Sequence, residues 1–269
     1  MYILSGGQDK LIHLFNTQAG THVASFDGCA WQVLDVAVAP DGNTFISGGG
    51  DKALFLWDVS THRILRRFPG NIQHINTVAY GAGGSIVAAG SYDCTVRLWD
   101  VRGNSRFPVA VLDEATDSVS SLQIHQQHDI LTGSIDGHTR LYDLRKGVLL
   151  TDNIQHPVTA VRFTQDAQAF LTASLDSTIR LMDRPTGTLL NSYQGHRATS
   201  YQTGCHLFHH DSFVVAGSED GLLHLWDLLS AKSVRQLAGH RRPISKIAIH
   251  PTGRSILTCA LDGTLRLWE

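Results

Sequence analysis

Four residues that can ligate a transition metal lie close together in the sequence: Cys205, His206, His209 and His210. Thiolate and imidazole groups are preferred zinc ligands, and a zinc site requires three or four of them to converge on one point. The segment is predicted to form a strand followed by a loop, so its alternate side chains point in opposite directions. We therefore interpret it as an exposed polar loop and predict that the chain holds no metal.

Seven aspartates are the other groups with potential for chemistry, because two neighbouring carboxylates can act as an acid and a base. They recur at spacings of 42, 42, 43, 40, 44 and 42 residues: Asp9, Asp51, Asp93, Asp136, Asp176, Asp220 and Asp262. Such spacing places them in equivalent turns of a repeated unit, too far apart to form a pair. The GAGG at 81–84 precedes no helix that would bind a phosphate, and no Gly-x-Ser-x-Gly motif is present. We predict no catalytic residue and no cofactor.

The same period indicates the fold. An aromatic or apolar residue stands six positions after each aspartate, and an acidic residue or asparagine follows it. These residues are Phe15, Trp57, Trp99, Tyr142, Met182, Trp226 and Trp268. A period of about 42 residues that ends in Trp-Asp is typical of a blade in a WD-repeat β-propeller. We predict an all-β, seven-bladed propeller that occupies residues 1–269 as one domain.

Each blade is predicted to be a four-stranded antiparallel meander. Residues 244–268 show three strands, ISKIAI, SILTCA and TLRLW, separated by the turns HPTG and LDG. The fourth strand comes from the start of the following repeat. By this count the first blade lacks its innermost strand and the last blade lacks its outermost strand. Either the chain is truncated, or the ring has open edges, which invite pairing with another chain.

Composition limits the classes of partner. The net charge is −2 and the isoelectric point is about 6.7, so direct binding to nucleic acid is not favoured. The cysteines Cys29, Cys94, Cys205 and Cys259 show no CxxC spacing. We find neither a signal peptide nor an apolar stretch of about 20 residues. We expect a cytoplasmic and nuclear protein with no membrane contact and no small-molecule substrate.

Several stretches resemble the mitogen-activated protein kinase organizer family of WD-repeat proteins, which also occurs as a spliceosome-associated factor. They are SGGGDKALFLWDV at 47–59, LDEA at 112–115, GSIDGHTRLYDLRKGVL at 133–149 and SLDSTIRLMDRPTGTLLNSYQGH at 174–196. The resemblance covers essentially the whole chain. It implies a non-catalytic scaffold that binds other proteins of kinase-signalling complexes, of pre-mRNA splicing complexes, or of both.

The resemblance also implies a hydrogen-bonded network inside some blades. In WD-repeat proteins the turn aspartate accepts a hydrogen bond from the histidine of a Gly-His pair, which is linked to a strand Ser or Thr and to the Trp. The full set is matched by His240, Thr258, Asp262 and Trp268. Most of a second set is matched by His196, Asp220 and Trp226. The remaining blades lack the Gly-His pair and are expected to depend on the aspartate and on packing.

The rim that carries the aspartate turns is the candidate partner-binding surface. The residue before the aspartate is apolar in three consecutive blades, at Tyr92, Ile135 and Leu175. Together these side chains would form an apolar crescent, and Trp31 and Tyr201, near the starts of inner strands, would add aromatic anchors. The alternative is that these side chains fold back and seal the turns.

Two arginines suggest a second function. The stretch WDVR at 99–102 matches fully, and YDLR at 142–145 loosely, the WDxR box of substrate receptors of cullin-RING ubiquitin ligases. This resemblance makes Arg102 and Arg145 candidate contacts for a ligase adaptor. The other interpretation pairs each arginine with nearby acids at the end of a blade.

Overall fold

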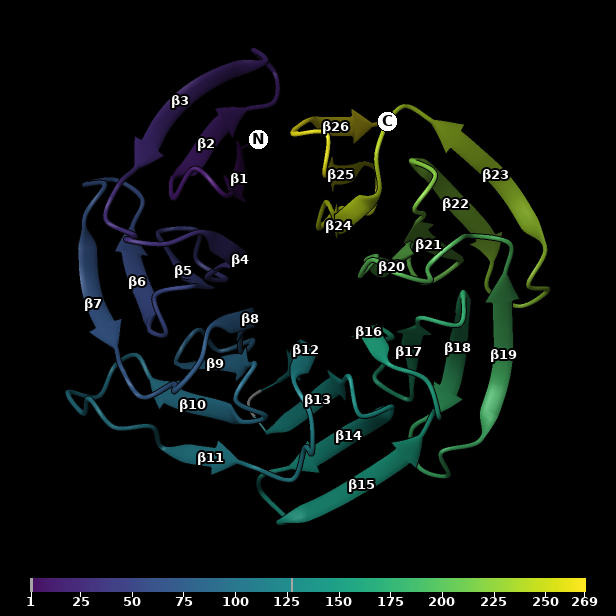
Figure 1. The fold of residues 1–269 in the computed structure, drawn as a ribbon, viewed down its shortest axis with the longest axis horizontal. Helices are drawn as coiled ribbons and strands as arrows, with labels where there is room; N and C mark the ends of the chain where they lie inside the picture. Colours follow the sequence, from purple (N-terminus) through teal and green to yellow (C-terminus); the bar gives the residue numbers. More distant parts are fainter. Residues whose placement is uncertain (1, 127) are drawn as a thin grey trace. The chain divides into compact units, whose positions relative to one another are not determined.

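The computed structural model describes residues 2–126 and 128–269, and these residues form 26 strands and no helix. Consequently, none of the described residues belongs to a helix that could cross a membrane. The strands make seven antiparallel sheets in chain order, each a meander of consecutive strands (Figure 1). The prediction of an all-β, seven-bladed propeller is confirmed.

The first three sheets use residues 2–112. The first sheet contains β1 (Tyr2–Gly6), β2 (Ile12–Asn16) and β3 (Thr21–Phe26). The second contains β4 (Val33–Val38), β5 (Thr44–Gly49), β6 (Leu54–Asp58) and β7 (Ile64–Phe68). The third contains β8 (Ile75–Tyr80), β9 (Ile86–Ser91), β10 (Val96–Asp100) and β11 (Ala110–Leu112).

The other four sheets follow from residue 119 onward. The fourth contains β12 (Val119–His125), β13 (Asp129–Ser134), β14 (His138–Asp143) and β15 (Val148–Asn153). The fifth contains β16 (Val158–Phe163), β17 (Ala169–Ser174), β18 (Thr178–Asp183) and β19 (Leu189–Gln194). The sixth contains β20 (Cys205–Phe208), β21 (Phe213–Gly217), β22 (Leu222–Asp227) and β23 (Ser233–Ala238). The seventh contains β24 (Ile244–Ile249), β25 (Ile256–Ala260) and β26 (Leu265–Trp268).

The first and last sheets have three strands each, whereas the five between them have four. In the first sheet the strand before the Asp9 turn is β1, so no strand of the described residues stands in the innermost position. In the seventh, β26 is the third strand, and no described strand occupies the fourth position. The strand count therefore matches the sequence expectation for both blades.

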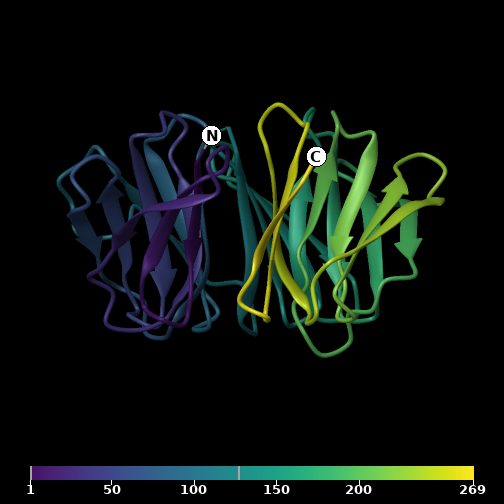
Figure 2. The ribbon, with the colours of Figure 1, turned by 90° about the horizontal axis from the view of Figure 1, so that it is seen from above.

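The chain divides into two compact units within its fourth sheet. The first unit comprises the residues up to Ile130 together with Tyr142–Val148, and the second comprises Leu131–Leu141 and Leu149–Glu269. In each unit the connections between strands lie at the two ends of the strands (Figure 2). One set of ends carries the aspartate turns together with the loops that lead from an outer strand to the next inner strand. We call these loops the crossover loops.

The core lies between neighbouring sheets. In the first unit Phe26 of β3 packs edge-on against Phe45 of β5, with ring centroids 4.9 Å apart, and both contact Trp57. In the second unit Tyr193 of β19 packs against Trp226 of β22. Because each sheet buries its apolar face only against a neighbour, a single blade would not be stable alone.

Glycine at the end of a blade's second strand allows the next inner strand to approach closely. A Cβ atom on Gly48 would lie 2.5 Å from the side chain of Ile75, and one on Gly217 would lie 2.7 Å from Ile244. Real Cβ atoms do not tolerate such distances, so a side chain at either position would force neighbouring blades apart.

Candidate interaction face at the crossover loops

The turn aspartates of three blades are neutralised by an arginine four residues later. Asp136 accepts from Arg140 at 2.8 Å, and Asp93 accepts from Arg97 at 2.8 Å. Asp176 pairs with Arg180 at 2.5 Å. Burial alone would raise the pKa of Asp176, but the guanidinium and the hydrogen bonds outweigh it, so that the pKa lies below its usual value. These carboxylates are charged structural groups within their turns.

The histidine network of the seventh blade is formed in the structure. The His240 Nε2 atom lies 2.7 Å from Thr258 Oγ1, which also accepts a hydrogen bond from Trp268 Nε1 at 2.9 Å. On the other side of the ring, His240 Nδ1 lies 3.4 Å from Asp262 Oδ2 and 3.0 Å from Thr264 Oγ1. Thr258 is fully buried and connects the imidazole to the indole.

Replacing Thr258 with valine is expected to lower the free energy of unfolding by about 1–3 kcal/mol, because the ring nitrogens of His240 and Trp268 would lose their shared hydroxyl partner. Denaturant titration of the purified protein measures this effect. Thr252→Val in the exposed turn before β25 is the matched control; it removes only a solvent-exposed contact with His250 Nδ1, so its effect should be small. Equal stability of Thr258→Val and the control would contradict the structural role of the network.

The corresponding residues of the sixth blade do not form the network. Neither nitrogen of the buried His196 imidazole has a hydrogen-bond partner among the described residues, and Trp226 Nε1 donates instead to the Gln194 carbonyl at 3.0 Å. The cause is visible in the sequence. Four residues before the turn aspartate, where the seventh blade has Thr258, the sixth has Ala216, which offers no hydroxyl. His196 is held by ring packing against Trp226, with centroids 5.6 Å apart.

Acidic residues of the turns also hold the crossover loops. Asp51 accepts the backbone N–H groups of Ala30 and Trp31 at 3.1 and 3.2 Å. In the second unit Glu219 accepts those of Thr199, Ser200 and Tyr201 at 2.6–2.9 Å. Burial would raise the pKa of Glu219, but these N–H groups lower it to about 2. The carboxylate is therefore ionised and fixes its loop.

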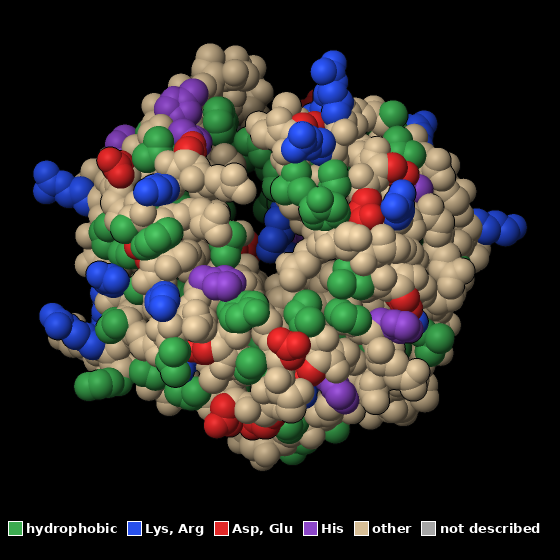
Figure 3. Space-filling view, in the orientation of Figure 1, with side chains coloured by type: hydrophobic (Ala, Val, Ile, Leu, Met, Phe, Trp, Pro, Cys, Tyr) green, Lys and Arg blue, Asp and Glu red, His purple; other side chains and the backbone are tan. Residues whose placement is uncertain are grey.

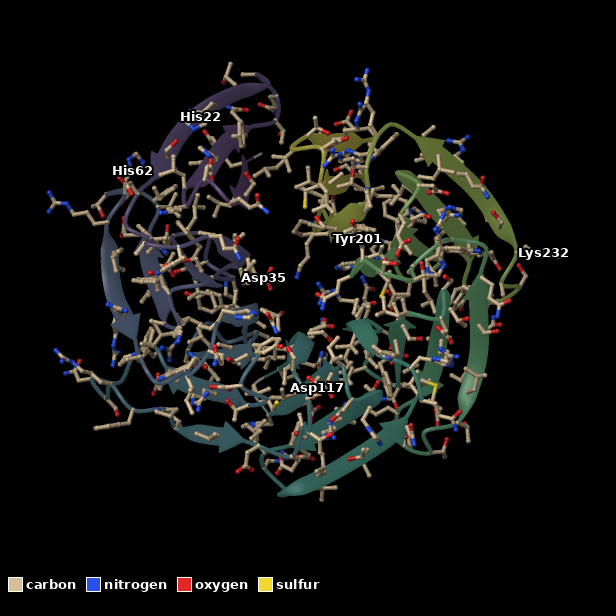
Figure 4. The ribbon with its side chains drawn as sticks, in the orientation of Figure 1. His22, Asp35, His62, Asp117, Tyr201 and Lys232 are labelled. Atoms are coloured by element: carbon tan, nitrogen blue, oxygen red, sulfur yellow. The ribbon has the colours of Figure 1, made fainter. Side chains whose placement is uncertain are left out.

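The loops held in this way present aromatic side chains to solvent. Trp31 is 63% exposed, and Tyr201, labelled in Figure 4 near β20, is 50% exposed. A third exposed ring, Tyr92, lies in the Asp93 turn before β10; it is 54% exposed and stacks on His74, with ring centroids 4.7 Å apart. Rigid exposed rings of this kind are favoured anchors in protein interfaces.

The side chains of the proposed apolar crescent differ in their exposure to solvent. Tyr92 belongs to the first unit, whereas Ile135 and Leu175 belong to the second and are half-buried. Their side chains are therefore less exposed than that of Tyr92, which is 54% exposed. A continuous crescent across the three blades stays a prediction.

Arg102 and Arg145 occupy equivalent turns after the third strand of their blades, and both are exposed. Asp100 accepts the backbone N–H of Arg102 at 2.8 Å, and Asp143 accepts that of Arg145 at 3.0 Å. The carboxylates thus fix the backbone of each turn. Nearby in the first unit is a pocket of about 250 Å³, lined by Ser85, Ile86, Leu98, Val109, Ala110, His128 and Leu144.

A polar cluster in the first sheet was not expected from the sequence. His13 Nε2 lies 2.7 Å from Asp9 Oδ2, and His13 Nδ1 lies 3.0 Å from Ser25 Oγ, which is also 2.9 Å from His22 Nε2. Acid, imidazole and hydroxyl are in the contact order of a nucleophilic triad. However, His13 stands four residues after its turn aspartate, as Arg97 does in the third blade. The position therefore gives the cluster the same role of holding a turn.

The cysteine and histidines considered as metal ligands are separated by the fold. Cys205 is buried in β20, where burial raises the pKa of its thiol to about 12. His206 follows on the same strand, and His209 and His210 lie in the exposed turn after it. Among the described residues no three His, Cys, Asp or Glu side chains are grouped so that they could hold a metal ion.

Comparison with known proteins agrees with this architecture. Residues 3–207 match the family model described as nucleolar protein 10-like, N-terminal domain, and residues 231–269 match the WD domain, G-beta repeat. The WD repeat domain-containing protein 83 of Rattus norvegicus is 51% identical over 268 residues, which cover 100% of this chain and 84% of the relative.

Two relatives are from more distant organisms. An uncharacterized WD repeat-containing protein of Schizosaccharomyces pombe is 48% identical over 269 residues, covering 100% of this chain and 90% of the relative. A WD repeat domain-containing protein 83 homolog of Dictyostelium discoideum is 29% identical over 295 aligned residues, covering 100% and 91%. The similarity thus extends over all seven sheets.

Proposed function

Because the chain belongs to the WD-repeat β-propeller family that includes WD repeat domain-containing protein 83, we propose that it is a non-catalytic scaffold that binds other proteins. The observation that carries this proposal is the set of exposed aromatic side chains on loops fixed by turn carboxylates. Trp31 on the Asp51-bound loop and Tyr201 on the Glu219-bound loop are the clearest cases. Ordered loops lose little conformational entropy on binding, so such rings are effective anchors.

The assemblies that fit the proposal are kinase-signalling complexes and pre-mRNA splicing complexes, as the resemblance to the kinase organizer family implies. A place in both the cytoplasm and the nucleus would accommodate both roles. The family model that matches residues 3–207 is named after a nucleolar protein, which favours a nuclear role. With a net charge of −2, contacts to proteins are favoured over direct contacts to nucleic acid.

A ubiquitin-ligase substrate receptor is the second candidate. It is favoured by the exposed side chains of Arg102 and Arg145, which follow Asp-Val and Asp-Leu in equivalent turns. An exposed guanidinium can form a bidentate pair with a carboxylate of an adaptor protein.

Affinity purification of the tagged protein from a native extract treated with RNase, followed by mass spectrometry, tests these functions. Splicing factors as the dominant co-purifying proteins would support the splicing role, and kinase-cascade components the signalling role. A cullin adaptor that is recovered with the wild type and lost with Arg102→Ala would establish the ligase role instead. Recovery of no protein above the untagged control would refute the scaffold proposal.

A further inference from the structure

The crossover loops of the first unit are acidic. They comprise residues 27–32, 69–74 and 113–118, each between an outer strand and the next inner strand. Their ionisable side chains other than His74 and Cys29 are all acidic and exposed: Asp27, Asp113, Glu114 and Asp117. No lysine or arginine occurs in these loops. Figure 3 shows acidic side chains gathered over the segment that joins β11 to β12, and Figure 4 labels Asp117 there.

The second unit has the opposite charge at the corresponding positions. Its crossover loops, residues 154–157, 195–204 and 239–243, contain Arg197, Arg241 and Arg242 and no aspartate or glutamate. Arg197 is offset by Glu219, whose Oε2 lies 3.4 Å from its Nε. The net charge of −2 for the whole chain therefore does not reflect the difference in charge between the crossover loops of the two units.

Hydrogen bonds connect the acidic loop at residues 113–118 with the strand that follows the His74–Tyr92 ring pair. Asn76, two residues after His74, donates to Ser118 Oγ at 2.8 Å and to the Val119 carbonyl at 2.9 Å. This contact fixes the end of the acidic loop next to the strand that begins beside His74 and Tyr92. The acidic groups and the stacked ring pair thus belong to one ordered face, which we call the acidic face.

The aromatic rings and carboxylates of this face favour a positively charged partner. An exposed indole at Trp31 and an exposed phenol at Tyr92 attract cations to their ring faces, and they also cover the aliphatic part of a lysine or arginine side chain. The exposed Lys10 and Lys52 of the aspartate turns offset part of the negative charge at these strand ends. The remaining exposed carboxylates attract a basic segment and repel phosphate groups. The carboxylates would weaken the binding of an RNA ligand to this face. A basic peptide would bind more tightly, through both the ring contacts and the electrostatic attraction.

We propose that the acidic face of the first unit binds a lysine- and arginine-rich segment of a partner protein. The inference deepens the scaffold function and rests on it, because it names the chemical class of one partner segment. Asp113, Glu114 and Asp117 supply the charge, and Trp31 and Tyr92 supply the contact area.

Fluorescence anisotropy with the full chain and two labelled peptides tests the proposal. The first peptide is a dodecamer that alternates Lys or Arg with Leu and Ser, and the second has Glu in place of every basic residue. The test variant combines Asp113→Asn, Glu114→Gln and Asp117→Asn, which keep side-chain size and remove charge. The matched control, Arg241→Gln with Arg242→Gln, removes exposed charges from the crossover loops of the second unit.

The basic peptide is expected to bind, and the triple variant should weaken it by about tenfold at low salt. The control should leave binding unchanged, and the acidic peptide should not bind the wild type. Equal binding of both peptides, or equal affinity of the triple variant and the wild type, would overturn the proposal. An RNA oligonucleotide that competes with the basic peptide for the same face would overturn it as well.

Failure of this inference is distinguishable from failure of the scaffold function. If the wild type retains co-purifying proteins but does not bind the basic peptide, the scaffold function stands and the inference is wrong. If no protein co-purifies, the scaffold function itself fails. Replacing Trp31 and Tyr92 with alanine provides an independent check, because it should weaken the basic peptide without changing the salt dependence of binding.

Discussion

Replacing Trp226 with alanine is expected to lower the free energy of unfolding by about 3–5 kcal/mol, the usual range for truncating a core aromatic residue. The indole is 1% exposed and packs against Tyr193, His196 and His224. Its loss would leave a cavity between the fifth and sixth sheets and leave the Gln194 carbonyl without its indole donor. Denaturant unfolding followed by far-ultraviolet circular dichroism measures the change.

Trp31→Ala is the matched control for this experiment. It removes the same side chain from a position that is 63% exposed, so the change in unfolding free energy should be close to zero. A loss of similar size for Trp31→Ala and Trp226→Ala would show that Trp31 is part of the core and not a binding anchor.

Acidification is expected to destabilise the sixth blade through His196. Burial lowers the pKa of this imidazole from 6.5 to about 4, and the neighbouring His224 adds to the shift. Below pH 6.5 the unfolded chain binds a proton that the folded state does not, so unfolding becomes more favourable as the pH falls towards 4. Above pH 6.5 the contribution is constant. The loss amounts to about 3 kcal/mol for this group.

The comparison of the wild type with His196→Leu isolates this effect. Leucine has no charge to bury, and the imidazole it replaces makes no hydrogen bond among the described residues. The unfolding free energy of the variant should therefore change less than that of the wild type between pH 7 and pH 4. Parallel pH profiles for the two proteins would show that His196 finds a proton acceptor as the pH falls.

The repeat period alone was sufficient to predict the fold and the turns. An aspartate every 42 residues or so, with an aromatic residue six positions on, specifies a blade because each residue has a fixed place in a period-2 strand or its turn. Counting the strands of each repeat also predicted that the first and last sheets have three strands instead of four. The arginine four residues after three of the aspartates is the sequence signal for the ion pairs in those turns.

Side-chain contacts were less predictable. Both His196 and His240 follow a glycine, yet only His240 has a hydroxyl partner, because Ala216 replaces the residue equivalent to Thr258. The exposed fractions of Tyr92, Ile135 and Leu175 depend on how each turn packs, which the sequence pattern does not encode. The charge of the crossover loops could not be predicted from the sequence, because the strand bounds are needed to define which residues belong to those loops.

The double variant Trp31→Ala, Tyr201→Ala provides the most direct measurement of the central claim, that exposed rings on fixed loops bind protein partners. The tagged variant and the wild type would be purified from the same extract, and the co-purifying proteins quantified together with the unfolding midpoint of each bait. The account predicts that the main partners are lost from the variant while the midpoint stays unchanged. Full retention of those partners by the folded variant would contradict it.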